Sequence, residues 1–238
     1  MKLAIITGAS RGLGQALFEQ LGNLGYQRID LSRSAPYEES RQIDLTSPEQ
    51  AHKVIQATLA DIDAGTIEEL LVINNAATNE PIGPPATHDA SSIITHLNIN
   101  VVSQILFLSA VMAKFRETAC PKMIANISSG AANFAFEGFS VYCAAKAGLE
   151  QFVRTVAAEQ QREPAPFTLV NINPGVMDTD MQTLMRDQTA ADFPAVDHFI
   201  NMKKVGQLAT PAQVAAGIIK IVTMDTVVSG ERYSAQEF

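Results

Sequence analysis

Short apolar runs and longer amphipathic segments alternate along most of the chain. A run such as "KLAIIT" at 2–7 has no polar interruption, which is typical of a strand buried on both faces of a parallel sheet. The segments between the runs place apolar residues three or four positions apart, the period of a helix. We expect strands at 2–7, 27–32, 70–74, 122–128, 167–173 and a short one within 227–235. We expect helices at 12–25, 47–64, 90–117, 140–162 and from 211 onward.

Two of the predicted helices carry start signals. Thr46 or Ser47 precedes Pro48, and Thr210 precedes Pro211, so that each proline occupies a first helical position after a capping residue. Strands that alternate with helices in this way predict an α/β fold, a doubly wound parallel sheet with helices on both faces. No repeat or linker divides the chain, so residues 1–238 are expected to form a single domain.

Composition limits the classes of protein that fit. The chain has 238 residues, 47% of them apolar, which suits one large domain. Its net charge is 17 − 25 = −8 and no basic run occurs, so neither a nucleic acid nor a membrane is an expected partner. Cys120 and Cys143 are too few for a disulfide framework, and the first apolar run is too short for a leader peptide. We expect a cytoplasmic protein.

The turn after the first strand is rich in glycine. It reads "TGASRGLG", with Gly8, Gly12 and Gly14 in the spacing G-x-x-x-G-x-G. Glycines let the backbone approach a pyrophosphate closely, and the N–H groups at the start of the next helix then face its negative charge. A glycine-rich turn that binds nothing remains the alternative.

Charged residues near the second strand bear on which nucleotide such a turn would hold. Arg33 follows this strand, and with Arg11 it would suit a 2′-phosphate. Asp30 is a candidate for the carboxylate that bonds a ribose 2′-hydroxyl, although it lies inside the strand and short of its tip. Arg33 also fits the simpler role of a solvated loop charge.

A tyrosine and a lysine share one face of the helix predicted at 140–162. Tyr142 and Lys146 are four residues apart in "YCAAK", and Ser129 stands thirteen residues before the tyrosine, just after a strand. Such a pair also arises by chance, so alone it is weak evidence of a site. The sequence "NNAA" after the strand at 70–74 fits either a ligand-facing loop or an ordinary Asx turn.

These motifs together resemble the short-chain dehydrogenase/reductase family. They are T-G-x-x-x-G-x-G at 7–14, N-N-A at 74–76, Ser129, Y-x-x-x-K at 142–146 and P-G-x-x-x-T at 174–179. They occur in the family's order over essentially the whole chain. The segments "NISSGAANFAFEGFSVYCAAKAGLEQF" and "NPGVMDTDMQTLMR" are most similar to the sepiapterin reductase and bacterial benzil reductase group. The resemblance implies a Rossmann-type fold that binds NADP.

The resemblance also implies catalytic roles. Tyr142 would donate a proton to the substrate carbonyl oxygen, and the Lys146 cation would favour the phenolate that remains. Ser129 would hydrogen-bond the same carbonyl oxygen. Asn100 would hold a water of the proton relay behind Lys146, with Asn98 as the second candidate for that role.

Coenzyme contacts follow from the same resemblance, and Tyr142 and Lys146 are among them. The phosphate loop would comprise Gly8, Ser10, Arg11, Gly12, Leu13 and Gly14. Arg33 would meet the 2′-phosphate, Asp44 and Leu45 the adenine, Asn75 the adenosine ribose, and Met177 and Thr179 the nicotinamide carboxamide. Two arginines without an acid at the tip of the second strand favour NADP over NAD.

The expected function is NADP-dependent reduction of a ketone or 1,2-dicarbonyl. Residues 178–209 would form a lid in which methionines and phenylalanines, with Phe134, Phe136 and Phe139, suit an aromatic substrate; packing on the sheet is the alternative. The helices at 90–117 and 140–162 are apolar enough for subunit contact in a homodimer or homotetramer. The four histidines show no metal spacing and are expected at the surface. The competing functions are an NAD-dependent alcohol dehydrogenase and a non-catalytic NADP sensor.

Overall fold

A parallel sheet of seven strands forms the centre of the protein. A computed structural model describes residues 1–238, and the strand order is β3-β2-β1-β4-β5-β6-β7. All neighbouring strands are parallel. Their bounds are β1 Lys2–Thr7, β2 Gln27–Ser32, β3 Ser40–Gln42, β4 Glu69–Asn74, β5 Lys122–Ile127, β6 Thr168–Asn173 and β7 Arg232–Ser234. The predicted doubly wound α/β fold is confirmed, and β3 is the one strand that the apolar pattern missed.

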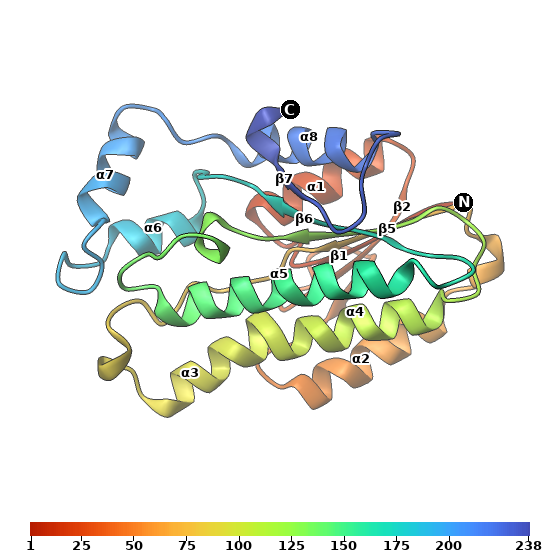
Figure 1. The fold of residues 1–238 in the computed structure, drawn as a ribbon, viewed down its shortest axis with the longest axis horizontal. Coiled ribbons are helices and arrows are strands. Elements are labelled where there is room, and N and C mark those ends of the chain that lie inside the picture. Colours follow the sequence, from red (N-terminus) through yellow and green to blue (C-terminus); the bar gives the residue numbers. More distant parts are fainter.

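Helices cover both faces of the sheet (Figure 1). The helices α1 Gly12–Asn23 and α8 Pro211–Val222 pack on one face, and α2 Pro48–Ala60, α4 Ser103–Lys114 and α5 Ser140–Gln160 pack on the other. Each face has its own apolar core, because alternate side chains of the buried strands point to opposite faces. Thr210 caps α8 through a capping box with Gln213, as the sequence predicted.

The helix predicted at 90–117 is interrupted. It consists of α3 Ala90–Leu97, a π-helical turn at Asn98–Val102 and α4. By length and composition alone the span Ala90–Lys114 is apolar enough to cross a membrane. In this fold Phe107, Leu108 and Val111 are fully buried against the sheet, so α4 is a core helix.

The predicted lid contains two short helices. They are α6 Asp180–Arg186 and α7 Val196–Lys204, and they lie beyond the carboxyl ends of the strands (Figure 1). The strand order reverses between β1 and β4, which in a doubly wound sheet creates a crevice at these carboxyl ends. The residues at this edge therefore decide what the protein can bind.

Candidate active site

The glycine turn and the "NNAA" loop meet where the strand order reverses. Asn75 joins them, because its side-chain amide donates to the carbonyl oxygens of Thr7 at 3.0 Å and of Gly8 at 3.1 Å. Gly8 has a φ of +74°, which few other residues adopt. A Cβ atom on Gly14 would overlap the Gly8 carbonyl, so the turn has no space for a side chain there. Asn75 thus braces the turn.

This turn fits the pyrophosphate of a dinucleotide. The helix α1 begins after Arg11 with no side-chain cap and no acidic residue in its first turn, so its leading N–H groups stay available to an anion. Leu13 is buried in the core beneath, which fixes the helix to the sheet. Ser10 lies half-buried in the turn itself. The Arg11 guanidinium forms an exposed ion pair of 2.7 Å with Asp180 of α6, so the turn is tied to the predicted lid.

At the tip of β2 the only charged side chain that faces solvent is Arg33. Asp30 is fully buried and accepts hydrogen bonds from the Ala9 N–H and from the hydroxyls of Ser32 and Ser40. A carboxylate engaged in this way joins β2 and β3 to the glycine turn and has no free side for a ribose. The Arg33 guanidinium is exposed and has no partner in the protein.

The other residues expected at the nucleotide lie along the same edge. Asp44 and Leu45 follow β3, where the exposed Asp44 carboxylate accepts the Thr46 N–H and the Leu45 carbonyl accepts the Ser103 hydroxyl. Met177 forms an isolated bridge with Ala209. Thr179 precedes α6, and its methyl group would lie 3.6 Å from a Cβ atom on Gly12, so the start of the lid faces the glycine turn.

Ser129, Tyr142 and Lys146 meet at the ends of β5 and α5. Tyr142 is almost fully buried, and the Ser129 hydroxyl is near enough to its phenol to lower the pKa of that phenol. The Lys146 ammonium lies 5.8 Å from the centre of the Tyr142 ring and donates to the Ile127 carbonyl at 2.8 Å. The neighbouring Ser128 is buried and its hydroxyl donates to Glu150, so Ser129 is the serine that faces the tyrosine.

Burial dominates the ionisation of this pair. It raises the pKa of Tyr142 to about 12, against a smaller lowering by the Ser129 hydrogen bond. It lowers the pKa of Lys146 to about 8, opposed by the negative charge of Glu150. Desolvation of Tyr142 is the larger effect on its pKa, and the Lys146 ammonium points to the Ile127 carbonyl. Tyr142 is therefore a protonated donor at neutral pH.

Asn100 lies in the π-helical turn and is buried. Its side-chain oxygen accepts the Thr78 N–H at 2.9 Å, and its amide donates to the Thr78 carbonyl at 2.7 Å and to His96 at 2.8 Å. Asn98 is instead half-buried and donates to the Thr46 carbonyl. Asn100 is thus held against the loop that follows "NNAA", as π turns at functional sites often hold a side chain.

The prediction that all histidines lie at the surface is wrong for His96. Its ring is fully buried, and its edge faces Tyr142 with 6.0 Å between the ring centres. Since the Asn100 amide is a donor, the His96 Nε2 atom must accept, and Nδ1 donates to the Glu80 carbonyl at 2.6 Å. Burial and the charge of Lys146 lower the pKa of His96, which favours this neutral form. The sequence does hold one sign of this contact, because His96 stands four residues before Asn100 and therefore on the same face of the predicted helix.

The aromatic residues expected to line a substrate pocket mostly pack on one another. Phe139, Phe193 and Phe199 are buried, with ring centres 4.8 and 5.5 Å apart in succession, and they join Tyr142 in a third apolar cluster. Phe134 remains 67% exposed. The predicted lid therefore rests on the tyrosine through this cluster. In α6 of the same segment the buried Gln182 amide has no partner for either polar atom, a state that a ligand or water normally relieves.

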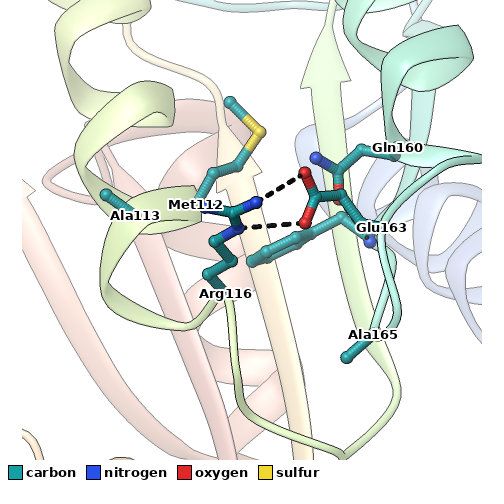
Figure 2. Close-up of a pocket in the computed structure, with 7 residues that line it drawn as sticks. Met112, Ala113, Arg116, Gln160, Glu163 and Ala165 are labelled. Atoms are coloured by element: carbon teal, nitrogen blue, oxygen red, sulfur yellow. Dashed lines mark hydrogen bonds and ion pairs between the residues drawn. The ribbon is translucent and has the colours of Figure 1, made fainter.

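A separate cavity of about 150 Å³ lies at the opposite end of the sheet (Figure 2). It sits between the last turns of α4 and α5, next to Phe167 at the start of β6. Arg116 and Glu163 span it with two hydrogen bonds of 2.9 and 3.1 Å. None of the predicted site residues lines this cavity.

Comparison with known proteins tests the family resemblance of this chain. The sequence model of the short chain dehydrogenase family matches residues 2–190. The chain belongs to this family. The match to the short-chain dehydrogenases covers the glycine turn, the serine and the tyrosine–lysine pair described above, so the sequence resemblance is confirmed.

Individual members of the short-chain dehydrogenase family are similar over the full length. The chain is 33% identical to the benzil reductase ((S)-benzoin forming) of Bacillus subtilis, covering 100% of both proteins. It is 28% identical to mouse sepiapterin reductase, covering 96% of this chain and 94% of that one. The crystal structure of the KRED1-Pglu enzyme superposes with a TM-score of 0.82 at 26% identity, covering 98% of this chain and 100% of that one.

Proposed function

We propose that the protein is a carbonyl reductase that uses NADPH to reduce a ketone or 1,2-dicarbonyl compound. One observation carries the proposal: Ser129, Tyr142 and Lys146 converge at the carboxyl ends of the strands, with Asn100 held in a π turn behind them. A protein that only senses a nucleotide has no use for a protonated phenol backed by a lysine. The similarity to a benzil reductase and to sepiapterin reductases supports this class of substrate.

Each residue has a definite task in this reaction. A bound nicotinamide coenzyme supplies the hydride. Ser129 donates a hydrogen bond to the substrate oxygen, which orients the carbonyl and stabilises its developing charge. Tyr142, whose pKa burial raises to about 12, gives its proton to that oxygen. The Lys146 ammonium stabilises the phenolate left behind.

The proposed coenzyme contacts follow the family resemblance, and the position of these residues at the carboxyl ends of the strands supports them. The turn from Gly8 to Gly14 would hold the pyrophosphate, Arg33 the 2′-phosphate, and Met177 and Thr179 the carboxamide. Arg33 supports NADPH over NADH because its guanidinium is free at the β2 tip while Asp30 is fully engaged inside the sheet.

The direct test follows NADPH absorbance during incubation with benzil and with aliphatic and aromatic diketones, repeated with NADH. Fast turnover with NADPH and slow turnover with NADH supports the proposal. A preference for NADH over NADPH, with oxidation of an alcohol by NAD⁺ in the reverse direction, would favour the NAD-dependent dehydrogenase. Tight NADPH binding without turnover of any carbonyl would favour the sensor.

Replacing Arg33 by alanine is expected to raise KM for NADPH by about ten- to a hundredfold, because a charge-assisted contact to phosphate is lost. KM for NADH should stay unchanged. Steady-state kinetics with both coenzymes measures the ratio. The matched control is Arg162→Ala, which removes an exposed arginine just after α5. Equal losses with NADPH and NADH would contradict the assignment of Arg33.

The pH dependence of reduction follows from Lys146. Its ammonium is the useful form, and burial lowers its pKa to about 8, so activity is present below that pH and is lost above it. We expect kcat/KM for NADPH, which reports the free enzyme, to be level at neutral pH and to fall by about tenfold for each pH unit above 8. In Lys146→Arg the fall of kcat/KM just above pH 8 should disappear, because a guanidinium stays protonated at these pH values. If kcat/KM of Lys146→Arg falls at the same pH as in the wild type, Lys146 is not the group whose deprotonation causes the fall.

Two further features support a homo-oligomer and a cytoplasmic location. Ile94 and Val102, on α3 and the π turn, are 57% and 41% exposed, and they extend the outer apolar side of the helix pair predicted for subunit contact. A homodimer or homotetramer that covers this side is part of the proposal, to be tested by analytical ultracentrifugation. Both cysteines are free thiols, in keeping with a cytoplasmic protein.

A further inference from the structure

A buried chain of polar side chains runs across the sheet below the catalytic residues. Asn74, Asn126 and Asn171 lie side by side on β4, β5 and β6. Asn74 donates to Asn126 at 2.9 Å, and Asn126 donates to Asn171 at 2.7 Å. Asn171 in turn donates to the backbone carbonyl of Glu150 at 3.2 Å. The chain of hydrogen bonds therefore ends on α5, one turn beyond Lys146.

The Glu150 carboxylate continues this chain to the last strand. It is 1% exposed, although a buried carboxylate is costly unless it is paired. Arg232 of β7 supplies the pair, with its Nε atom 3.0 Å from the carboxylate, and the Ser128 hydroxyl donates to the same oxygen. The second branch of the Arg232 guanidinium donates to the Ser129 backbone carbonyl at 3.2 Å. One arginine thus contacts both the backbone of Ser129, just after β5, and the charge of Glu150 within α5.

We propose that Glu150 and Arg232 are positioning residues for the reduction, with Arg232 fixing the backbone of Ser129 and Glu150 holding a negative charge one helical turn from Lys146. The inference rests on the proposed function. The strand β7 contributes no residue to the proton path. Through Arg232 and its partner Glu150 it would nevertheless control the position of Ser129 and the charge state of Lys146.

The surroundings of Lys146 make Glu150 the main charge acting on it. On α5 the ammonium faces Tyr142 and Glu150, on β5 it meets the Ile127 carbonyl, and on α3 it faces the neutral His96. Glu150 is the one carboxylate in this set, and its charge raises the pKa of Lys146 against the effect of burial. Removing that charge should let desolvation lower the pKa further.

The guanidinium fork explains why an arginine is needed. Its Nε and Nη2 atoms reach two different acceptors in fixed directions, which the single ammonium of a lysine does not reproduce. An ion pair that served stability alone would need the Glu150 contact and not the Ser129 contact.

Variants at both positions test the inference. Arg232→Met and Arg232→Lys are each expected to lower kcat for benzil by about ten- to a hundredfold through a misplaced Ser129, with the Kd for NADPH unchanged. Glu150→Gln keeps the shape and removes the charge, so the fall of kcat/KM above pH 8 should move down by about one pH unit. The matched control is Arg116→Met with Glu163→Gln, an arginine–glutamate pair at the other ends of α4 and α5 (Figure 2).

An NMR titration of ¹³C-labelled lysine supplies a readout that needs no turnover. The Lys146 signal, assigned from its loss in Lys146→Met, should titrate at lower pH in Glu150→Gln than in the wild type and should not move in the control. An unchanged Lys146 titration overturns the inference, and so does a variant set that loses only thermal stability while kcat and the pH profile stay as in the wild type. Absent turnover in the wild type with a shifted Lys146 titration would reject the proposed function and retain the role of Glu150.

Discussion

Tyr142→Phe should lose about a thousandfold or more of its turnover, because the phenol proton is the acid of the reaction and general acid catalysis typically contributes a factor of this order. The substitution removes one oxygen atom and leaves the ring in place. Its contacts with Phe139 and His96 therefore persist, and the fold should be unaffected. The measurement is single-turnover oxidation of NADPH in the presence of benzil.

The companion measurement is NADPH binding, followed by quenching of protein fluorescence or by calorimetry. Tyr142→Phe should bind NADPH as the wild type does, since the glycine turn and the β2 tip are untouched. Retained binding with lost turnover assigns the phenol to the chemical step. A variant that keeps more than about a tenth of the wild-type rate would refute the role of Tyr142 as proton donor.

Ser129→Ala should lower kcat by about a hundred- to a thousandfold, the usual effect of removing one donor to a developing oxyanion. The serine hydroxyl lies beside the Tyr142 phenol, so both groups can reach the same substrate oxygen. KM should change little, because the hydrogen bond is stronger in the transition state than in the ground state. Steady-state kinetics with benzil separates kcat from KM.

Ser128→Ala is the matched control for this substitution. The Ser128 hydroxyl is buried and donates to Glu150, away from the substrate edge. Its loss should cost less than about tenfold in kcat, with some loss of thermal stability from an unmade buried hydrogen bond. Equal losses from the two serines would mean that neither one specifically binds the substrate oxygen.

The strands could be predicted from the sequence almost residue by residue. The predictions at 2–7 and 27–32 match β1 and β2. The strand β1 is continuously apolar because it is buried on both faces, whereas β2 alternates the apolar Ile29 and Leu31 with polar residues. The strand β3 has three residues, two of them exposed, so it leaves no such pattern. Its pairing depends on β2 and on the Ser40 hydroxyl that reaches Asp30, contacts that only the tertiary structure provides.

The candidate site could be predicted in its members but not in its electrostatics. Tyr142 and Lys146 were predicted from the family resemblance that the motifs carry together, whereas the balance of their pKa values depends on burial and on Glu150, one turn further along α5. His96 was not predicted to be buried, because its position four residues before Asn100 places both on one helical face but does not tell whether that face meets solvent or the site. The sequence left two roles open for the phenylalanines of residues 178–209 for a related reason: composition indicates phenylalanines but not whether they line a pocket or pack against each other.

The π turn at Asn98–Val102 determines how many residues separate the site from the buried face of α4. Its hydrogen bond runs from the Ser103 N–H to the Asn98 carbonyl, one residue more than in an α-helical turn. Deleting one residue here would restore a regular helix and rotate everything beyond it by about 100°. Either Phe107 and Val111 would then leave the sheet, or Asn100 would leave Thr78. A single extra residue thus sets the register between two surfaces of one helix, so that insertions and deletions in this segment are excluded even where substitutions are tolerated.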